Sequence, residues 1–263
     1  MKRIILTLLI LCFWSIPALA VIRGEPVSYN AGDLTLNGYI AYDDSTSNKR
    51  PGILVVHEWW GHNQYARKRA EMLAELGYTA LAVDMYGEGR QADHPKDASK
   101  FAAEIRHNLP EARKRFAAAM RLLQKHPSVD PQKIAAIGFC FGGGIALQMA
   151  RQGLDLDAVI SFHGSLATDT PAEAGMVKAR ILVCDGADDK LVTPGQIQSF
   201  LREMQIADVD YKFISYPGAK HSFTNPDADI YAEKFNIPVG YNAEADKRSW
   251  QDMQNFLKES FTK

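Results

Sequence analysis

The chain has 263 residues, of which 46% are hydrophobic and 23% are charged. This length and composition allow one sizeable hydrophobic core and exclude disordered and fibrous proteins. The formal net charge of −1 gives no support to a nucleic-acid partner.

The first 20 residues have the pattern of a secretory signal peptide. Lys2 and Arg3 precede the apolar run 4–11, and the small-residue triplet 18–20 has the A-x-A form of a cleavage site. We therefore expect a mature chain that starts near Val21 and is exported to the periplasm or secreted. Sequencing the N-terminus of the exported protein tests this expectation.

Two other interpretations of this N-terminal segment, a membrane anchor and a lipidation signal, have less support from the sequence. An uncleaved membrane anchor needs about 20 apolar residues, and the run is shorter, so no stable membrane insertion is expected after cleavage. Lipidation at Cys12 needs a small residue before it, where the chain has Leu11. Removal of Lys2 and Arg3 leaves 28 of the 30 basic residues against 31 acidic ones, a net charge of −3.

Residues 21–263 contain no internal repeat or long linker, so we expect a single domain. An N-terminal β-hairpin is predicted over 27–42, with turns at 30–33 and at Asn37-Gly38. Short continuous apolar runs, typical of strands buried on both faces of a parallel sheet, then follow at 52–56, 79–83, 134–137, 158–160, 181–183 and 211–214.

Helical patterns separate most of these runs. They cover 65–76 and 110–124, begin at the capping-box residue Thr193, and begin again near Asn242. Alternating strands and helices predict a mostly parallel central sheet with helices on both faces, as in the α/β-hydrolase fold.

Cys140 lies in the segment Gly138-Phe-Cys-Phe-Gly142, between an apolar run and a helical pattern. This is the G-x-S-x-G nucleophile elbow with cysteine in place of serine, and the glycines make room for a sharp strand-to-helix turn. The positive end of the following helix favours the thiolate. A buried, unreactive cysteine between two phenylalanines is the alternative.

A thiol nucleophile needs a base and an orienting acid, which follow it in that fold in the order nucleophile, acid, histidine. Asp188 and Asp189 follow one later strand, and His221 is the only histidine in the loop after the next. Residue order alone leaves the choice between the two aspartates open.

On these motifs the chain resembles the dienelactone hydrolase family, from about Gly52 to the C-terminus. The resemblance implies that Asp189, in Gly186-Ala-Asp-Asp189, is the acid and that His221, in a His-Ser-Phe motif, is the base. It also implies that Glu58, in Glu58-Trp-Trp-Gly61, takes the proton of the thiol when substrate arrives.

The backbone amides of Trp59 and Phe141 would form the oxyanion hole. We expect the side chains of Trp59 and Trp60 to form an apolar wall. The implied reaction is hydrolysis of a small ester or lactone through a cysteine thioester. We also expect a monomer that uses no cofactor or metal.

One feature of the family is missing. Members that act on dienelactone itself hold its carboxylate with arginines, one of them shortly after the catalytic histidine. Here that segment is His221-Ser-Phe-Thr-Asn225, and Arg90 stands at a shifted position in the early loop. An anionic dienelactone is therefore not the expected substrate.

The remaining histidines are expected to be structural or solvated. His57, His62 and His163 lie near strand ends, whereas the others are placed in exposed helix or loop positions: His94, His107 and His126. The segments 87–109 and 224–240 are candidate lids.

Cys140 and Cys184 show no metal-ligand spacing and no disulfide framework. In the expected fold a strand separates them, roughly 10 Å between strand axes, which exceeds the ~7 Å limit for a disulfide.

Two other function classes remain open. A thiol-dependent peptidase, amidase or acyltransferase would use the same scaffold. A non-catalytic envelope binding protein would have no need of Cys140, Asp189, His221 and Glu58 together.

Overall fold

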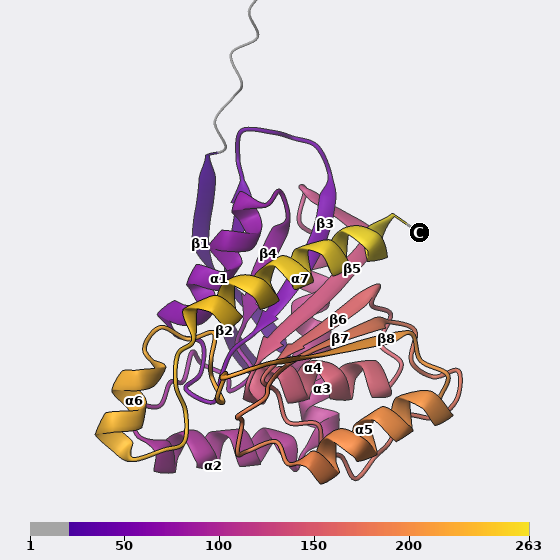
Figure 1. Cartoon of the computed structure of the whole chain (residues 1–263). Coiled ribbons are helices and arrows are strands. Elements are labelled where there is room, and N and C mark those ends of the chain that lie inside the picture. The colour runs from indigo at the N-terminus through magenta and orange to yellow at the C-terminus, as the bar shows by residue number, and fades with distance from the viewer. Residues whose placement is uncertain (1–20, 263) are drawn as a thin grey trace, which may run out of the picture.

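The computed structural model describes residues 21–262. Its strands form one eight-stranded sheet in the order β1-β2-β4-β3-β5-β6-β7-β8 (Figure 1). β1 and β2 pair antiparallel with each other, β2 pairs antiparallel with β4, and all other pairs are parallel. The strands are β1 Ile22–Ala31, β2 Leu34–Asp43, β3 Arg50–Val56, β4 Thr79–Val83, β5 Val129–Phe139, β6 Ala158–Phe162, β7 Arg180–Gly186 and β8 Tyr211–Tyr216. The predicted α/β-hydrolase fold is confirmed.

Helices cover both faces of the sheet. They are α1 Gln64–Glu75, α2 Pro95–Arg106, α3 Leu109–Gln124, α4 Phe141–Arg151, α5 Pro194–Ile206, α6 Ala228–Phe235 and α7 Ala243–Phe261. Residues of α1 and α7 share one core cluster, whereas residues of α2, α3, α4 and α5 share the other. Figure 1 shows α7 crossing in front of the strands.

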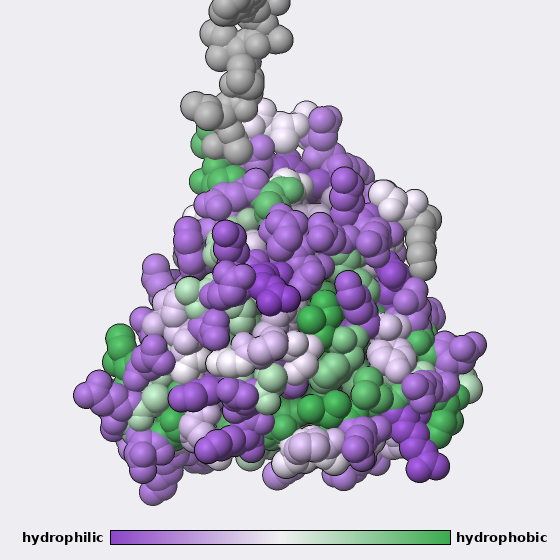
Figure 2. Space-filling model, viewed as in Figure 1, coloured by the Kyte–Doolittle hydropathy of each residue, from purple (hydrophilic) through white to green (hydrophobic). Residues whose placement is uncertain are grey.

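The side chains of β3 explain the continuous apolar runs. Leu54 and Val56 belong to the core cluster on one face, and Ile53 and Val55 belong to the cluster on the other. Because successive residues of a strand point to opposite faces, a strand covered by helices on both sides must be apolar throughout. Figure 2 shows a mainly hydrophilic surface on the side viewed, with apolar residues more frequent along its lower part.

The N-terminal hairpin is present, with its turn at residues 32–33. The second predicted turn, at Asn37-Gly38, is wrong, because both residues lie within β2 and pair with Ser28 and Val27. Glycine is needed at 38 for packing, since a Cβ there would lie 2.9 Å from the carbonyl oxygen of Ala82.

The predicted helices 65–76 and 110–124 are confirmed as α1 and α3, and Thr193 forms a capping box at the start of α5. Two helices were not predicted, and both lie in the candidate lid segments. α2 begins after the N-cap residue His94, with proline in its first turn, and α6 is only 8 residues long.

The backbone turns sharply between β5 and α4. Cys140 has φ of 52° and ψ of −114°, a conformation that L-residues rarely adopt. A Cβ at Gly138 would lie 2.2 Å from the carbonyl oxygen of Gly142, and one at Gly142 would lie 2.3 Å from that of Val56. Only glycine at both positions lets α4 begin directly against β3.

Replacing Gly142 with alanine therefore forces α4 away from β3. We expect the free energy of unfolding, measured by urea denaturation, to fall by about 3 kcal/mol. Gly195→Ala is the matched control, because a Cβ there meets nothing closer than 3.9 Å. That variant should keep the wild-type stability or gain up to about 1 kcal/mol. Equal stabilities of the two variants would contradict this packing account.

Candidate active site

Cys140, His221 and Asp189 meet at the carboxyl ends of the parallel strands. His221 Nε2 lies 3.0 Å from Cys140 Sγ, and His221 Nδ1 lies 2.7 Å from Asp189 Oδ2. Cys140 follows β5, Asp189 follows β7 and His221 follows β8. Strands that run parallel end at the same edge of the sheet, so residues up to 81 positions apart are brought together.

Asp189, not Asp188, is the aspartate that contacts His221. Asp189 is 7% exposed, and its Oδ1 accepts hydrogen bonds from the amides of Leu191 at 2.7 Å and Val192 at 3.3 Å. Asp188 is exposed, and its carboxylate makes no hydrogen bond or ion pair with His221. The two amides fix the carboxylate, so its other oxygen can orient the imidazole.

The electrostatics of the site favour a protonated imidazole. Burial works against protonation of His221, but the neighbouring Cys140 and the hydrogen bond to Asp189 outweigh it and raise its pKa to about 10. Nearby Asp185, which follows Cys184 in β7, is also perturbed. Burial, with the charge of Asp189, raises the pKa of Asp185 to about 7. Nothing in the sequence pattern had singled out Asp185.

Glu58, which follows β3, is also buried at this edge of the sheet, but its hydrogen-bond partner is Asn225 and not Cys140. It is 2% exposed, and its Oε2 accepts a hydrogen bond of 2.6 Å from Asn225 Nδ2. Its Oε1 has no hydrogen-bond partner within residues 21–262, and no bond joins Glu58 to Cys140 there. Burial raises the pKa of Glu58, and the bond from Asn225 opposes this.

The amides of Trp59 and Phe141 have no acceptor in the described part of the chain. Trp59 lies in the turn after β3, and Phe141 is the first residue of α4, where a helix leaves its N–H groups unpaired. Both are adjacent to residues of the site, Glu58 and Cys140.

A cavity of about 430 Å³ opens onto the sulfur. Cys140, His221 and Ser222 line it, with an apolar wall formed by Trp59, Leu191, Val192, Ile237, Pro238 and Val239. Trp60 was expected in this wall and does not line the cavity. Its ring packs against Tyr231 of α6, with ring centroids 4.6 Å apart.

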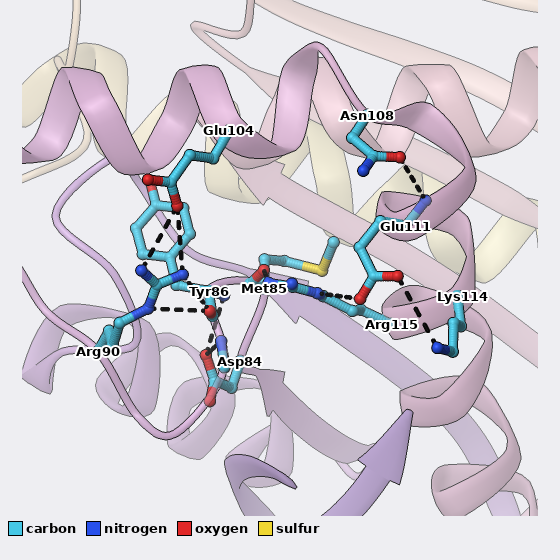
Figure 3. Close-up of polar contacts among 10 residues, drawn as sticks. Asp84, Met85, Tyr86, Arg90, Glu104, Asn108, Glu111, Lys114 and Arg115 are labelled. Atoms are coloured by element: carbon cyan, nitrogen blue, oxygen red, sulfur yellow. Dashed lines mark hydrogen bonds and ion pairs between the residues drawn. The ribbon is translucent and has the colours of Figure 1, made fainter. Parts of the chain in front are cut away.

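Arg90 is committed elsewhere, as Figure 3 shows. Its guanidinium donates to the carbonyl oxygen of Tyr86 at 2.6 and 3.1 Å and pairs with Glu104. Arg106 at the end of α2 lines the cavity instead. Sequence reasoning missed it because α2 itself was not predicted.

The structural histidines are buried, as expected for His57, His62 and His163. His163 Nδ1 accepts the amide of Cys140 at 3.1 Å, and its Nε2 pairs with Thr224. His94 and His107 are exposed, and His126 is half-buried.

Cys184 is buried in β7 and free, with β6 between it and Cys140. Within residues 21–262, no cluster of three His, Cys, Asp or Glu side chains suits a metal ion. None of the helices in that range combines the length and apolarity needed to cross a membrane.

Known proteins are similar to this chain in sequence and architecture. A putative carboxymethylenebutenolidase of Aquifex aeolicus (strain VF5) is 28% identical over 217 residues, covering 80% of this chain and 92% of the relative. The crystal structure of a dienelactone hydrolase-like promiscuous phosphotriesterase from metagenomic libraries is 37% identical, with a TM-score of 0.85, covering 90% of this chain and 98% of the other.

An uncharacterized protein of Caenorhabditis elegans is 42% identical over 152 residues, which cover 56% of this chain and 92% of the relative. The profile of the dienelactone hydrolase family matches residues 36–261, nearly the whole described chain. The chain therefore belongs to the dienelactone hydrolase family and is an enzyme that hydrolyses ester or lactone bonds.

Proposed function

We propose that the chain hydrolyses small esters or lactones through a thioester on Cys140. The observation that carries the proposal is the continuous series of contacts from Sγ through His221 to Asp189, with Cys140 and His221 lining a cavity of about 430 Å³. A thiol, a base within hydrogen-bonding reach and a group that orients the base are the requirements of nucleophilic catalysis.

In the first half-reaction Sγ attacks the carbonyl carbon, and the carbonyl electron pair moves onto oxygen. The amides of Trp59 and Phe141, which have no acceptor within residues 21–262, donate to that oxyanion. The tetrahedral species then collapses, the bond to the alcohol oxygen breaks, and His221 Nε2 gives its proton to the departing alcohol. The acyl group remains on Cys140 as a thioester.

In the second half-reaction the neutral His221 takes a proton from water, and the hydroxyl attacks the thioester carbonyl. Collapse expels the sulfur, which regains its partnership with the imidazole, and the acid leaves. Asp189 holds Nδ1 throughout, because its second oxygen is fixed by two backbone amides. This keeps Nε2 directed at the sulfur in both steps.

For Glu58 we infer the role implied by the family resemblance, acceptance of the thiol proton as substrate arrives. Its Oε1 supports this, because this oxygen is buried and has no partner among residues 21–262. Oε2 remains bound to Asn225 at 2.6 Å. Under this proposal the proton rests on the His221 imidazole in the free enzyme. Glu58 holds it while arriving substrate separates the sulfur from the imidazole, and then returns it to His221 Nε2, which gives it to the departing alcohol.

The substrate class follows from the cavity. Its walls are mainly apolar, with Arg106 among the lining residues, and the arginine after His221 that grips an anionic lactone in the family is absent. We infer small, mainly apolar esters and lactones. A panel of p-nitrophenyl esters, lactones and peptide amides separates this activity from a peptidase or acyltransferase. A phosphotriester belongs in the panel because of the relative of that name.

The signal peptide, the mature start near Val21 and export concern residues outside the described range and remain predictions. The single domain over 21–263 and the monomeric state remain predictions as well.

Cys140→Ala should abolish ester hydrolysis, with kcat/KM lowered by at least about 10⁴-fold. The fold should survive, because alanine is smaller and the sulfur lines a cavity rather than filling a packed core position. Turnover of a p-nitrophenyl ester and the thermal midpoint are measured together. Cys184→Ala is the control and should retain activity. Wild-type turnover by the Cys140 variant would refute the proposal, and inactivity of the wild type towards every ester and lactone would favour a binding protein.

Glu58→Gln should lower kcat/KM about a hundredfold, because it removes a proton acceptor while keeping the hydrogen bond from Asn225. Since burial raises the folded-state pKa of Glu58, the wild type loses stability as pH rises above the ordinary glutamate value near 4.5. The variant lacks this loss. It should equal the wild type near pH 4 and exceed it by about 1 kcal/mol or more at pH 8 in urea denaturation.

Glu233→Gln, an exposed position on α6, is the control for both measurements. Full activity of the Glu58 variant would show that Glu58 takes no proton from the thiol.

A further inference from the structure

His57 lies directly after β3 and is fully buried beside the candidate oxyanion hole. Its Nδ1 lies 2.5 Å from the carbonyl oxygen of Glu58, and its Nε2 lies 3.3 Å from the amide nitrogen of Met85. The mechanism proposed above uses neither nitrogen. Both contacts are to backbone groups, which suggests that the ring determines the course of the chain.

The two partners fix the tautomer of His57. The amide of Met85 can only donate, so Nε2 must accept and carries no proton. The carbonyl of Glu58 can only accept, so Nδ1 must carry the proton. Burial lowers the pKa of His57, which keeps the ring in this neutral form. A protonated ring would point a second donor at the Met85 amide.

The carbonyl of Glu58, which contacts His57 Nδ1 and also accepts the Gly61 amide at 3.1 Å, fixes the direction of the Trp59 amide. The carbonyl of Glu58 and the N–H of Trp59 belong to one planar peptide unit, and the described chain contains no cis peptide. In a trans peptide these groups point in opposite directions. With the carbonyl held against His57, the Trp59 N–H points away from the ring, and Trp59 lines the catalytic cavity.

The same ring supports the other donor. His57 stacks on Phe141, with ring centroids 5.6 Å apart and planes inclined by 22°. Phe141 carries the second amide of the candidate hole at the start of α4. One imidazole therefore bonds to the peptide that bears one donor and packs on the side chain of the residue that bears the other.

The segment after β4, which contacts His57 through the Met85 amide, is itself held by polar contacts, several of which Figure 3 shows around Asp84, Met85 and Tyr86. Asp84 accepts the amides of Tyr86, Gly87 and Gly89 at 2.7 to 3.0 Å. Arg115 donates to the carbonyl of Met85 at 2.8 Å, next to the amide that binds His57. The Tyr86 hydroxyl donates to the carbonyl of Trp59 at 3.0 Å. The segment after β4 therefore bonds to His57, which contacts the Glu58 carbonyl, and also to the carbonyl of Trp59.

We propose that His57 is a positioning residue that aims the amides of Trp59 and Phe141 at the developing oxyanion. The inference rests on the proposed function, because it assumes that an oxyanion forms at Cys140. The role assigned to His57 differs from those of the catalytic residues, because His57 touches neither substrate nor sulfur and still affects the rate of acylation.

The test compares two reactions of the same sulfur. Acylation by a p-nitrophenyl ester develops an oxyanion, whereas alkylation by iodoacetamide displaces iodide from a methylene carbon and develops none. His57→Phe keeps an aromatic ring for stacking but removes both hydrogen bonds. We expect its acylation rate to fall roughly 10- to 100-fold, with KM nearly unchanged and alkylation within about twofold of wild type.

Two further variants make the comparison specific. His57→Gln offers one donor and one acceptor and should recover much of the lost acylation. His62→Gln, at a second buried histidine of the same loop whose ring makes no hydrogen bond to the Glu58–Trp59 peptide, should acylate like the wild type. Equal losses in acylation and alkylation would mean a general distortion of the site and would overturn the inference, as would wild-type acylation by His57→Phe.

A measurement on the wild type needs no variant to fold. Nitrogen-15 spectra of the histidine side chains should show His57 with a proton on Nδ1 and none on Nε2. The opposite tautomer, or a doubly protonated ring, overturns the inference. A wild-type enzyme that reacts with iodoacetamide but acylates with no ester would instead contradict the proposed function, so the two failures are distinguishable.

Discussion

Cys140 occupies a left-handed backbone conformation, with φ of 52°, at the junction of β5 and α4. This backbone conformation determines where the neighbouring groups of the site lie. The turn lifts Sγ out of the sheet towards His221, leaves the Phe141 amide unpaired at the start of a helix, and needs glycine at two flanking positions. Strain of this kind persists only where the surroundings determine it, and here the amide of Cys140 bonds to both Phe162 and His163.

Buried polar groups hold the rest of the site. His163 joins the Cys140 amide to Thr224, and Tyr65 and Arg69 bind the same threonine from α1. Arg69 also pairs with Asp246 of α7 at 2.6 Å. Breaking one such contact leaves a buried polar atom without a partner, which costs about 1–3 kcal/mol. The catalytic geometry is therefore coupled to the packing of α1 and α7 on the sheet.

Local patterns in the sequence were sufficient to predict much of the fold and of the site. Continuous apolar runs located the parallel strands, and glycine spacing located the elbow at Cys140. Strand order then placed His221 at the same edge of the sheet. Each of these features depends on a short stretch of neighbouring residues, because burial pattern and turn geometry leave a local trace in the sequence.

Other features depend on contacts that no local pattern records. The Glu58–Asn225 bond joins residues 167 positions apart. α2 buries mainly small side chains, among them Ala98 and Ala102, so its apolar stripe is weak and Arg106 could not be placed in the cavity. His57 sits in the sequence like any polar residue after a strand, and its importance follows from the segment after β4 that surrounds it.

The central claim is that the sulfur of Cys140 carries the acyl group. Rapid acid quenching during turnover of a slowly hydrolysed p-nitrophenyl ester, followed by proteolysis and mass spectrometry, tests it directly. The account predicts the acyl mass on the peptide that contains Cys140, in a linkage that hydroxylamine cleaves at neutral pH. An unmodified Cys140 during turnover, or the acyl group on Ser165 or Ser222 of the cavity wall, would contradict it.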